Sequence, residues 1–203
     1  KKFKRNYMKN NKSIKIMNTT IIILDYGSQY TQLIARKIRE CNVHSIILPY
    51  DCSEKLIAKY KVRGIILSGG PSSVYDSNAP SLSKFIFKYN VPILGICYGF
   101  QLLVNHFNGQ VKSSGKAEYG NADINLLDES LLFKDISVKT NVWMSHGDKV
   151  TILPNDWIVT SKSNNNIISS AEYEDLFGVQ FHPEVYHTKD GFTLLNNFLF
   201  KIC

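Results

Sequence analysis

Residues 92–101 read PILGICYGFQ, and this stretch decides the fold. The apolar run before Cys97 predicts a buried strand, and the residues after it predict a helix. Gly95 and Gly99 stand two residues before and after the cysteine, where a sharp strand-to-helix turn needs small neighbours. Such a turn exposes the sulfur, and the N-terminus of the helix favours its thiolate. Cys97 is therefore a candidate nucleophile; a buried cysteine at a glycine-bounded turn is the alternative.

Strand and helix patterns alternate on both sides of this stretch. Short apolar strands joined through helices predict an α/β fold, an open and mostly parallel sheet flanked by helices on both faces, with a smaller strand-rich second half. Such sheets carry their sites at the carboxyl ends of the strands, which points to loops 25–28, 68–71 and 97–99. The predicted strands are 19–24, 43–48, 64–67, 91–96, 120–127, 141–144, 157–160, 167–173 and 176–181, and the predicted helices are 29–40, 53–60, 80–89, 99–107 and 191–202.

A cysteine nucleophile needs a base, and the sequence Phe181-His-Pro-Glu184 offers one. In an extended segment His182 and Glu184 face the same side, roughly 6.6 Å apart along the chain. The carboxylate is then placed to orient the imidazole, as in a nucleophile–base–acid triad. Alone, a His-Pro-Glu sequence is more typical of a surface loop; its occurrence in one chain with the cysteine turn favours catalysis.

Two glycines follow the third predicted strand, in Ser68-Gly69-Gly70-Pro71. Consecutive glycines let the backbone approach a ligand closely and expose N–H groups. If this loop lies beside the cysteine turn, the amides of Gly70 and Tyr98 are placed to hold an oxyanion. An ordinary turn is the alternative.

The charge of the chain is concentrated at its N-terminus. Residues 1–17 hold seven of the 24 basic residues and no acid, which leaves 17 basic residues against 17 acidic ones in the rest. We therefore expect a basic, disordered tail over 1–18 and one neutral domain over 19–203, which argues against nucleic acid as a partner. No apolar run reaches the ~18 residues of a membrane span, and no secretory signal is visible. The four cysteines show no zinc spacing, so we expect no metal, free thiols and a cytoplasmic location.

The chain resembles the class I (triad-type) glutamine amidotransferases. The matching stretches run from about residue 21 to residue 200 and read LDYGSQYTQLIARKIRE, ILSGGPSSVY, LGICYGFQLL, AEYGNA, VWMSHGDKV and GVQFHPEVYHT. Within the family, DYGSQYTQLIAR and WMSHGDKV are most similar to the glutaminase domains of GMP synthetases. The resemblance implies a set of site residues: the nucleophile Cys97, the base His182, the orienting Glu184, and the oxyanion donors Gly70 and Tyr98. It also implies that glutamine is bound by Gln101 and by the backbone of Met144, Ser145 and His146.

The resemblance also implies an activity. The expected reaction is hydrolysis of glutamine to glutamate through a cysteine thioester, which needs no cofactor. The ammonia would aminate XMP to GMP in an ATP pyrophosphatase domain or subunit, which would use ATP and Mg²⁺; this chain holds no Walker lysine after Ser68-Gly-Gly-Pro. We expect an excised domain rather than a separate subunit. The alternatives are the glutaminase part of another class I amidotransferase, a hydrolase of other γ-glutamyl or peptide substrates, and a non-enzymatic regulatory module.

Overall fold

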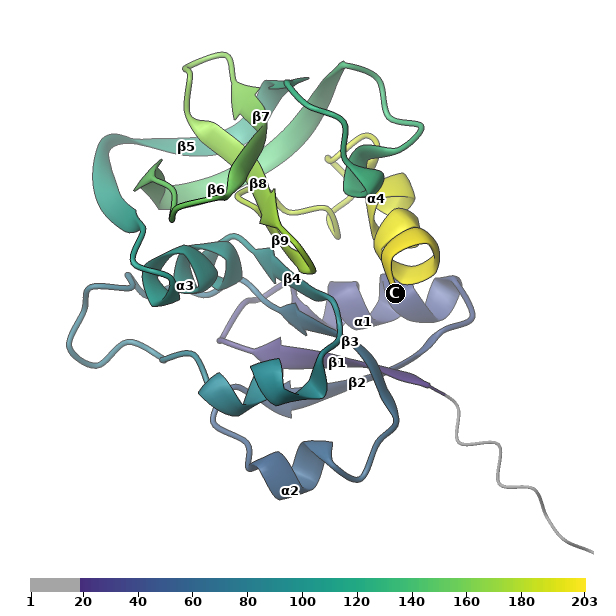
Figure 1. The fold of residues 1–203 in the computed structure, drawn as a ribbon. Helices are drawn as coiled ribbons and strands as arrows, with labels where there is room; N and C mark the ends of the chain where they lie inside the picture. Colours follow the sequence, from purple (N-terminus) through teal and green to yellow (C-terminus); the bar gives the residue numbers. More distant parts are fainter. Residues whose placement is uncertain (1–18) are drawn as a thin grey trace, which may run out of the picture.

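The computed structural model describes residues 19–203, without the side chains of residues 114–117. The predicted tail at 1–18 thus lies outside the described residues. Within them the strands form one nine-stranded sheet in the order β2-β1-β3-β4-β9-β8-β7-β5-β6 (Figure 1). The strands are β1 (Thr20–Asp25), β2 (His44–Pro49), β3 (Val62–Leu67), β4 (Ile93–Ile96), β5 (Gln110–Leu126), β6 (Lys139–Ile152), β7 (Ile158–Ser163), β8 (Ile168–Tyr173) and β9 (Leu176–Val179). The helices are α1 (Thr31–Glu40), α2 (Glu54–Ile57), the 3₁₀ helices η1 (Lys84–Tyr89) and η2 (Leu131–Phe133), α3 (Tyr98–His106), α4 (Gly191–Asn197) and the π-helical turn η3 (Phe198–Ile202).

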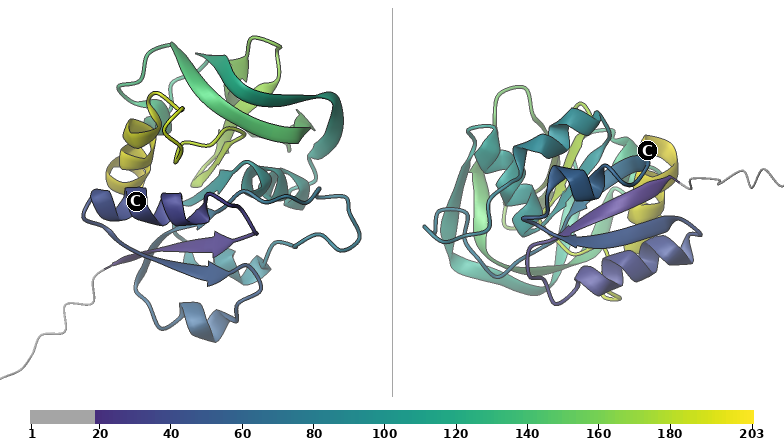
Figure 2. Two further views of the ribbon diagram at one scale, coloured as in Figure 1. Left: turned by 180° about the vertical axis from the view of Figure 1, so that it is seen from behind. Right: turned by 90° about the horizontal axis from the view of Figure 1, so that it is seen from below.

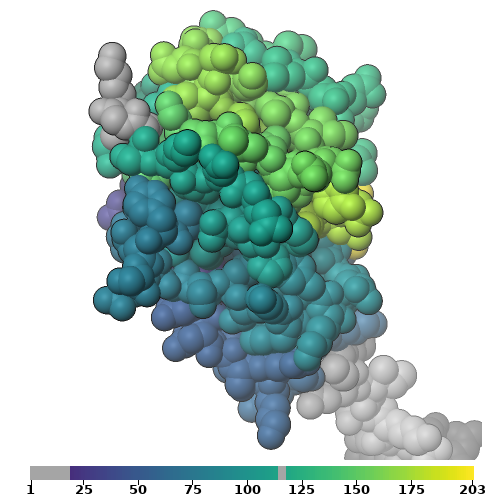
Figure 3. All heavy atoms as spheres, turned by 60° about the vertical axis from the view of Figure 1, so that its left-hand side comes forward, coloured from purple at the N-terminus to yellow at the C-terminus, as the bar shows by residue number. Residues whose placement is uncertain are grey.

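The sheet changes character at β9. Strands β2, β1, β3, β4 and β9 pair in parallel, whereas β9, β8, β7, β5 and β6 pair antiparallel. In Figure 3 the second-half strands, in green, lie above the first-half elements, in blue. The β9 strand therefore joins the two halves, and its end lies beside the end of β4.

Strand β1 shows why the parallel half is buried on both faces. Its side chains alternate: Ile21 and Ile23 belong to one apolar core, and Ile22 and Leu24 to the other. The first core is covered by α1 and α4, which lie side by side on one face of the sheet (Figure 2). The second core takes apolar residues of α2, η1 and α3 on the opposite face. Burial on both faces accounts for the unbroken aliphatic run of β1.

The predicted α/β fold with flanking helices is confirmed, and several element boundaries differ. The strand predicted over 120–127 spans Gln110–Leu126, and the helix predicted over 53–60 spans only Glu54–Ile57. The helix predicted over 80–89 is a 3₁₀ helix of six residues, which ends at Asn90 in a left-handed conformation with φ 46°. The strand predicted over 141–144 extends from Lys139 to Ile152, because β6 pairs along most of its length with β5. The closing helix predicted over 191–202 is α-helical up to Asn197 and π-helical beyond it. Residues 19–203 contain no helix with both the length and the apolar character that a membrane crossing requires.

Candidate active site

Cys97 lies at the turn between β4 and α3 in a strained backbone conformation. Its φ is 52° and its ψ −104°, which a non-glycine residue rarely adopts and which costs roughly 1–3 kcal/mol. Neighbouring elements hold it there: the Cys97 amide donates to the Val179 carbonyl at 2.7 Å, and the Cys97 carbonyl accepts from the Gln101 amide at 3.1 Å. The turn thus places the sulfur at the carboxyl end of β4 and the N-terminus of α3.

The two glycines that flank Cys97 are required by close packing. A Cβ at Gly99 would lie 2.4 Å from the Leu67 carbonyl oxygen, and a Cβ at Gly95 would lie 2.6 Å from the Phe100 amide nitrogen. Both distances are shorter than a carbon atom tolerates. Any larger residue would push α3 away from β3 or open the turn.

His182 and Glu184 form a buried pair in the segment that follows β9. The Nδ1 atom of His182 lies 2.8 Å from Oε1 of Glu184, and the two side chains are 4% and 0% exposed. The His182 backbone is fixed at both ends, since its amide donates to the Trp143 carbonyl at 3.0 Å and its carbonyl accepts from the Thr188 hydroxyl at 2.6 Å. The ring of Tyr30 meets the imidazole edge-on, with centroids 5.1 Å apart. The imidazole therefore has little freedom to rotate.

The imidazole of His182 favours its charged form. Burial is the largest influence and opposes the charge, but the Glu184 carboxylate and hydrogen bonds with Cys97 and Glu184 outweigh it and raise the pKa of His182 well above its usual value. The electrostatic interaction with Cys97 also raises the pKa of His182. The His182–Glu184 pair consequently suits an imidazolium.

Gly69 lies between the sulfur-bearing turn and the imidazole. A Cβ on Gly69 would be 3.0 Å from Cε1 of His182 and 3.6 Å from Cβ of Cys97. The loop is held by Ser68, whose hydroxyl accepts from the Tyr26 amide at 2.9 Å and whose carbonyl accepts from the Gly99 amide at 3.1 Å. The glycine loop is thus fixed against α3, beside both reactive side chains.

A cleft of about 510 Å³ opens over these residues. Gly70 and Tyr98 both line it, and a Cβ at Gly70 would lie 3.3 Å from the Tyr98 ring. Tyr98 is the first residue of α3, so its amide has no acceptor within the helix. The cleft is lined by Gly27, Ser28, Gln29, Tyr30, Gly70, Pro71, Ser72, Ser73, Cys97, Tyr98, Gln101, Tyr119, Ser145, His146, Gly147, Asp148 and His182. All three loops predicted at the carboxyl ends of the strands therefore contribute to one cleft or its immediate wall.

The structure brings together most, though not all, of the predicted site residues at the cleft surface. Gln101, Ser145 and His146 line it with Cys97 and His182, while Glu184 lies behind His182. Met144 does not line it, and this residue is only 1% exposed. The prediction for Met144 concerned its backbone, and that role stays a prediction.

His146 contacts a second buried carboxylate. Its Nδ1 atom lies 2.8 Å from the Asp148 carbonyl, and its Nε2 atom lies 3.4 Å from Oε2 of Glu118. Burial lowers the pKa of His146, against the opposing charge of Glu118. Because a carbonyl only accepts, Nδ1 carries the proton in neutral His146.

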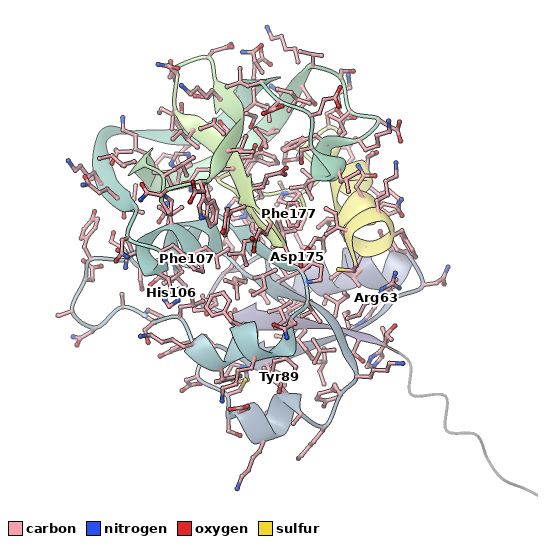
Figure 4. The ribbon with its side chains drawn as sticks, viewed as in Figure 1. Arg63, Tyr89, His106, Phe107, Asp175 and Phe177 are labelled. Carbon is pink, nitrogen blue, oxygen red and sulfur yellow. The ribbon has the colours of Figure 1, made fainter. Side chains whose placement is uncertain are left out.

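His106, the last residue of α3, has a packing role. The His106 ring stacks on Phe87 with centroids 5.1 Å apart and meets Phe107 edge-on, and it does not line the cleft. Figure 4 shows His106 beside Phe107. The described residues contain no cluster of three or more His, Cys, Asp or Glu side chains placed to hold a metal ion.

Sequence reasoning missed one buried polar side chain at the nucleophile. Gln180 is fully buried, and its Nε2 atom lies 3.7 Å from the sulfur of Cys97. The available signal was the stretch GVQFHPEVYHT, in which Gln180 precedes the histidine by two residues. In an extended segment Gln180 faces the same side as His182 and Glu184, so the spacing that paired those two residues could also have pointed to Gln180.

Comparison with known proteins assigns the family. Residues 22–202 match the model of the glutamine amidotransferase class-I family, so the chain belongs to that family. It is 51% identical over 185 residues to "GMP synthase [glutamine-hydrolyzing]" of Petrotoga mobilis, a match that covers 90% of this chain and 36% of that protein. It is 49% identical over 190 residues to the protein of the same name from Caldanaerobacter subterraneus, covering 93% and 37%. The chain thus spans little more than a third of the length of these relatives.

Solved structures show the same relationship. The structure of a putative GMP synthase subunit from Thermoplasma acidophilum superimposes with a TM-score of 0.78 at 26% identity, covering 90% of this chain and 92% of that one. A glutamine amidotransferase from Thermotoga maritima superimposes with a TM-score of 0.66 at 22% identity, covering 83% and 77%, and supports the fold alone.

Proposed function

We propose that this chain hydrolyses the side-chain amide of glutamine and delivers the ammonia to a GMP-forming synthetase. The observation that carries the proposal is the buried Cys97–His182–Glu184 arrangement at the wall of the cleft, with Gly70 and Tyr98 lining the same cleft. It is supported by membership of the class I glutamine amidotransferase family and by the names of the relatives.

The first half of the reaction forms a thioester. The Cys97 thiolate attacks the carboxamide carbon of glutamine, and the amides of Gly70 and Tyr98 stabilise the negative oxygen of the tetrahedral intermediate. Imidazolium His182 gives its proton to the leaving nitrogen, and ammonia departs as the C–N bond breaks. One oxyanion donor contributes roughly 3 kcal/mol to lowering the barrier.

The second half releases glutamate. Neutral His182 takes a proton from water, the resulting hydroxide attacks the γ-glutamyl thioester, and the C–S bond breaks to regenerate the thiolate. Glu184 stabilises the imidazolium that gives up its proton in the first half and forms again in the second, and it keeps the ring oriented. Gln101, Ser145 and His146 line the part of the cleft where the substrate would lie.

The synthetase half of the proposal concerns a partner. Amination of XMP would require ATP and Mg²⁺, which we assign to an ATP pyrophosphatase portion outside this chain, in the cytoplasm. The turn Ser68-Gly69-Gly70-Pro71 carries no phosphate-binding lysine and faces Cys97. No step of the glutaminase reaction passes through the nucleotide.

The test measures glutamate release from glutamine by the wild type and by Cys97→Ala. We expect loss of turnover in Cys97→Ala and wild-type turnover in Cys52→Ala, which removes another buried thiol that does not line the cleft. Turnover that survives in Cys97→Ala would refute the mechanism. Adding the synthetase portion of a GMP synthase with XMP and ATP should raise a low basal rate of glutamate release and yield GMP. A panel of other γ-glutamyl substrates and other amidotransferase partners would test the rival functions.

A further inference from the structure

A chain of hydrogen bonds leads from the Asp148 carbonyl to the nucleophile, and its last two bonds are buried. Nε2 of Gln101 lies 3.1 Å from the Asp148 carbonyl oxygen and 3.2 Å from Oε1 of Gln180. Nε2 of Gln180 in turn lies 3.7 Å from the sulfur of Cys97. The two amide side chains therefore join β6 to the tip of the nucleophile turn.

The chemistry of the groups fixes the direction of every bond in this chain. The Asp148 carbonyl only accepts, so the amino group of Gln101 must face it. The second N–H of that amino group then donates to Gln180, which must present its oxygen to Gln101. This leaves the amino group of Gln180 facing Cys97, and the sulfur is the acceptor.

Burial keeps this arrangement in place. Gln180 is fully buried and Gln101, which lines the cleft, is only 3% exposed, so bulk water has little access to their amides. The Gln180 backbone is held as well, since its amide donates to the Ser169 carbonyl at 2.8 Å. The second lone pair of the Asp148 carbonyl accepts from Nδ1 of His146 at 2.8 Å. A rotation of either glutamine amide would therefore bury unpaired groups.

The sulfur has different partners in its two protonation states. A Cys97 thiol can donate to the Ser145 carbonyl, 3.8 Å away, whereas a thiolate cannot. A donor aimed at the sulfur favours the thiolate, because hydrogen bonds to a charged acceptor are the stronger ones. His182 is one such hydrogen-bond partner of the Cys97 sulfur.

We propose that Gln180 is a catalytic residue whose side-chain amide stabilises the Cys97 thiolate, and that Gln101 and the Asp148 carbonyl hold that amide in its donating orientation. The expected effect of Gln180 on glutamine hydrolysis rests on the proposed function. Gln180 does not line the cleft, so it acts on the nucleophile and leaves glutamine binding to other residues.

The test substitutes Gln180 in two ways and follows thiol reactivity directly. Gln180→Met removes the donor at similar length, and Gln180→Glu places a carboxylate oxygen against the sulfur. The rate of alkylation of Cys97 by iodoacetamide is measured against pH, with peptide mapping to isolate the site. We expect both curves to move to higher pH, and the Gln180→Glu curve to move further. In glutamine hydrolysis kcat should fall roughly 10- to 100-fold in Gln180→Met, with KM within about twofold.

The matched control is Asn197→Leu, which removes another buried side-chain amide, one that donates to the Leu132 and Lys134 carbonyls at 3.1 and 2.7 Å, far from the sulfur. It should leave the alkylation curve unchanged. A Gln180→Met curve that superimposes on the wild-type curve would overturn the proposal. Because alkylation needs no glutamine, this outcome is distinct from failure of the glutaminase proposal.

The wild type provides a measurement that does not depend on the folding of the Gln180 variants. The side-chain amide resonances of Gln180 should shift with pH at the same midpoint as Cys97 alkylation, and this transition should vanish in Cys97→Ala. Resonances that stay in place across that midpoint would contradict a hydrogen bond from Gln180 to the sulfur.

Discussion

The exchange of Glu184 for glutamine tests the electrostatic part of the site. The substitution keeps the shape of the side chain and an oxygen able to face Nδ1 of His182, but it removes the charge. Oε2 of Glu184 accepts no hydrogen bond from any described residue, so the amide nitrogen of the variant would lack a partner as well. Glu184→Gln should therefore stabilise the charged form of His182 less than Glu184 does, and it should lower the free energy of unfolding.

The expected loss of activity follows from the burial and spacing of this pair. The two side chains are 4% and 0% exposed, with a hydrogen bond of 2.8 Å. Replacing a charged hydrogen bond by a neutral one costs about 1 kcal/mol at least. Two unit charges about 4 Å apart attract by about 4 kcal/mol at an effective dielectric constant of about 20, which sets the upper end. The range corresponds to a kcat lower by about 5-fold to about 10³-fold.

The assay is steady-state glutamate release by wild type and Glu184→Gln, with circular dichroism to compare folding. KM should change little, since Glu184 does not line the cleft. The control is Glu172→Gln, a partly buried carboxylate that accepts from the Ser130 hydroxyl and should leave kcat unchanged. A folded Glu184→Gln variant with kcat within twofold of the wild type would refute the assignment of charge stabilisation to this carboxylate.

Three further predictions follow from the geometry. Gly99→Ala would place its Cβ 2.4 Å from the Leu67 carbonyl, so we expect an unfolding midpoint in urea below that of the wild type and loss of turnover; a normal midpoint with full activity would contradict the close packing. His182 has a raised pKa in the folded chain, so its stabilising contribution is complete below its unfolded pKa of about 6.5 and is lost as the pH rises through the higher folded value. The difference in unfolding free energy between wild type and His182→Asn should accordingly be larger at pH 6 than at pH 9, and the opposite order would contradict the imidazolium. Tyr30→Ala removes the ring packed edge-on against His182, and we expect kcat to fall about 2- to 10-fold, a change that glutamate release under saturating glutamine would detect.

Local signals in the sequence sufficed for the turn at Cys97. Its two flanking glycines and the apolar run before it predict a strand, a sharp turn and a helix, and the structure shows β4, the turn and α3 in that order. The short step from His182 to Glu184 likewise predicts that the two side chains meet, since it depends only on the geometry of an extended segment.

Contacts between distant segments were harder to predict. The extension of β6 to Ile152 depends on pairing with β5, which no local pattern encodes. The place of Gln180 beside Cys97 depends on the order of strands in the sheet, and 83 residues separate the two in sequence. The segment at 80–89 had an apolar pattern suited to an α-helix, yet Ser83 donates to the Tyr50 carbonyl at 3.1 Å and the helix begins only at Lys84.

The parallel pairing of β4 with β9 ties reactivity to the integrity of the sheet. Gly95 pairs with Gly178 and Ile96 with Val179, so the next residue on each strand brings Cys97 and Gln180 together, with His182 just beyond. A slip of one residue would turn the side chains of β9 to the opposite face. The enhanced reactivity of the Cys97 thiol should therefore be lost in a single cooperative step when this pairing melts, rather than fade gradually, and iodoacetamide labelling mapped to Cys97 during denaturation would report on this one strand junction.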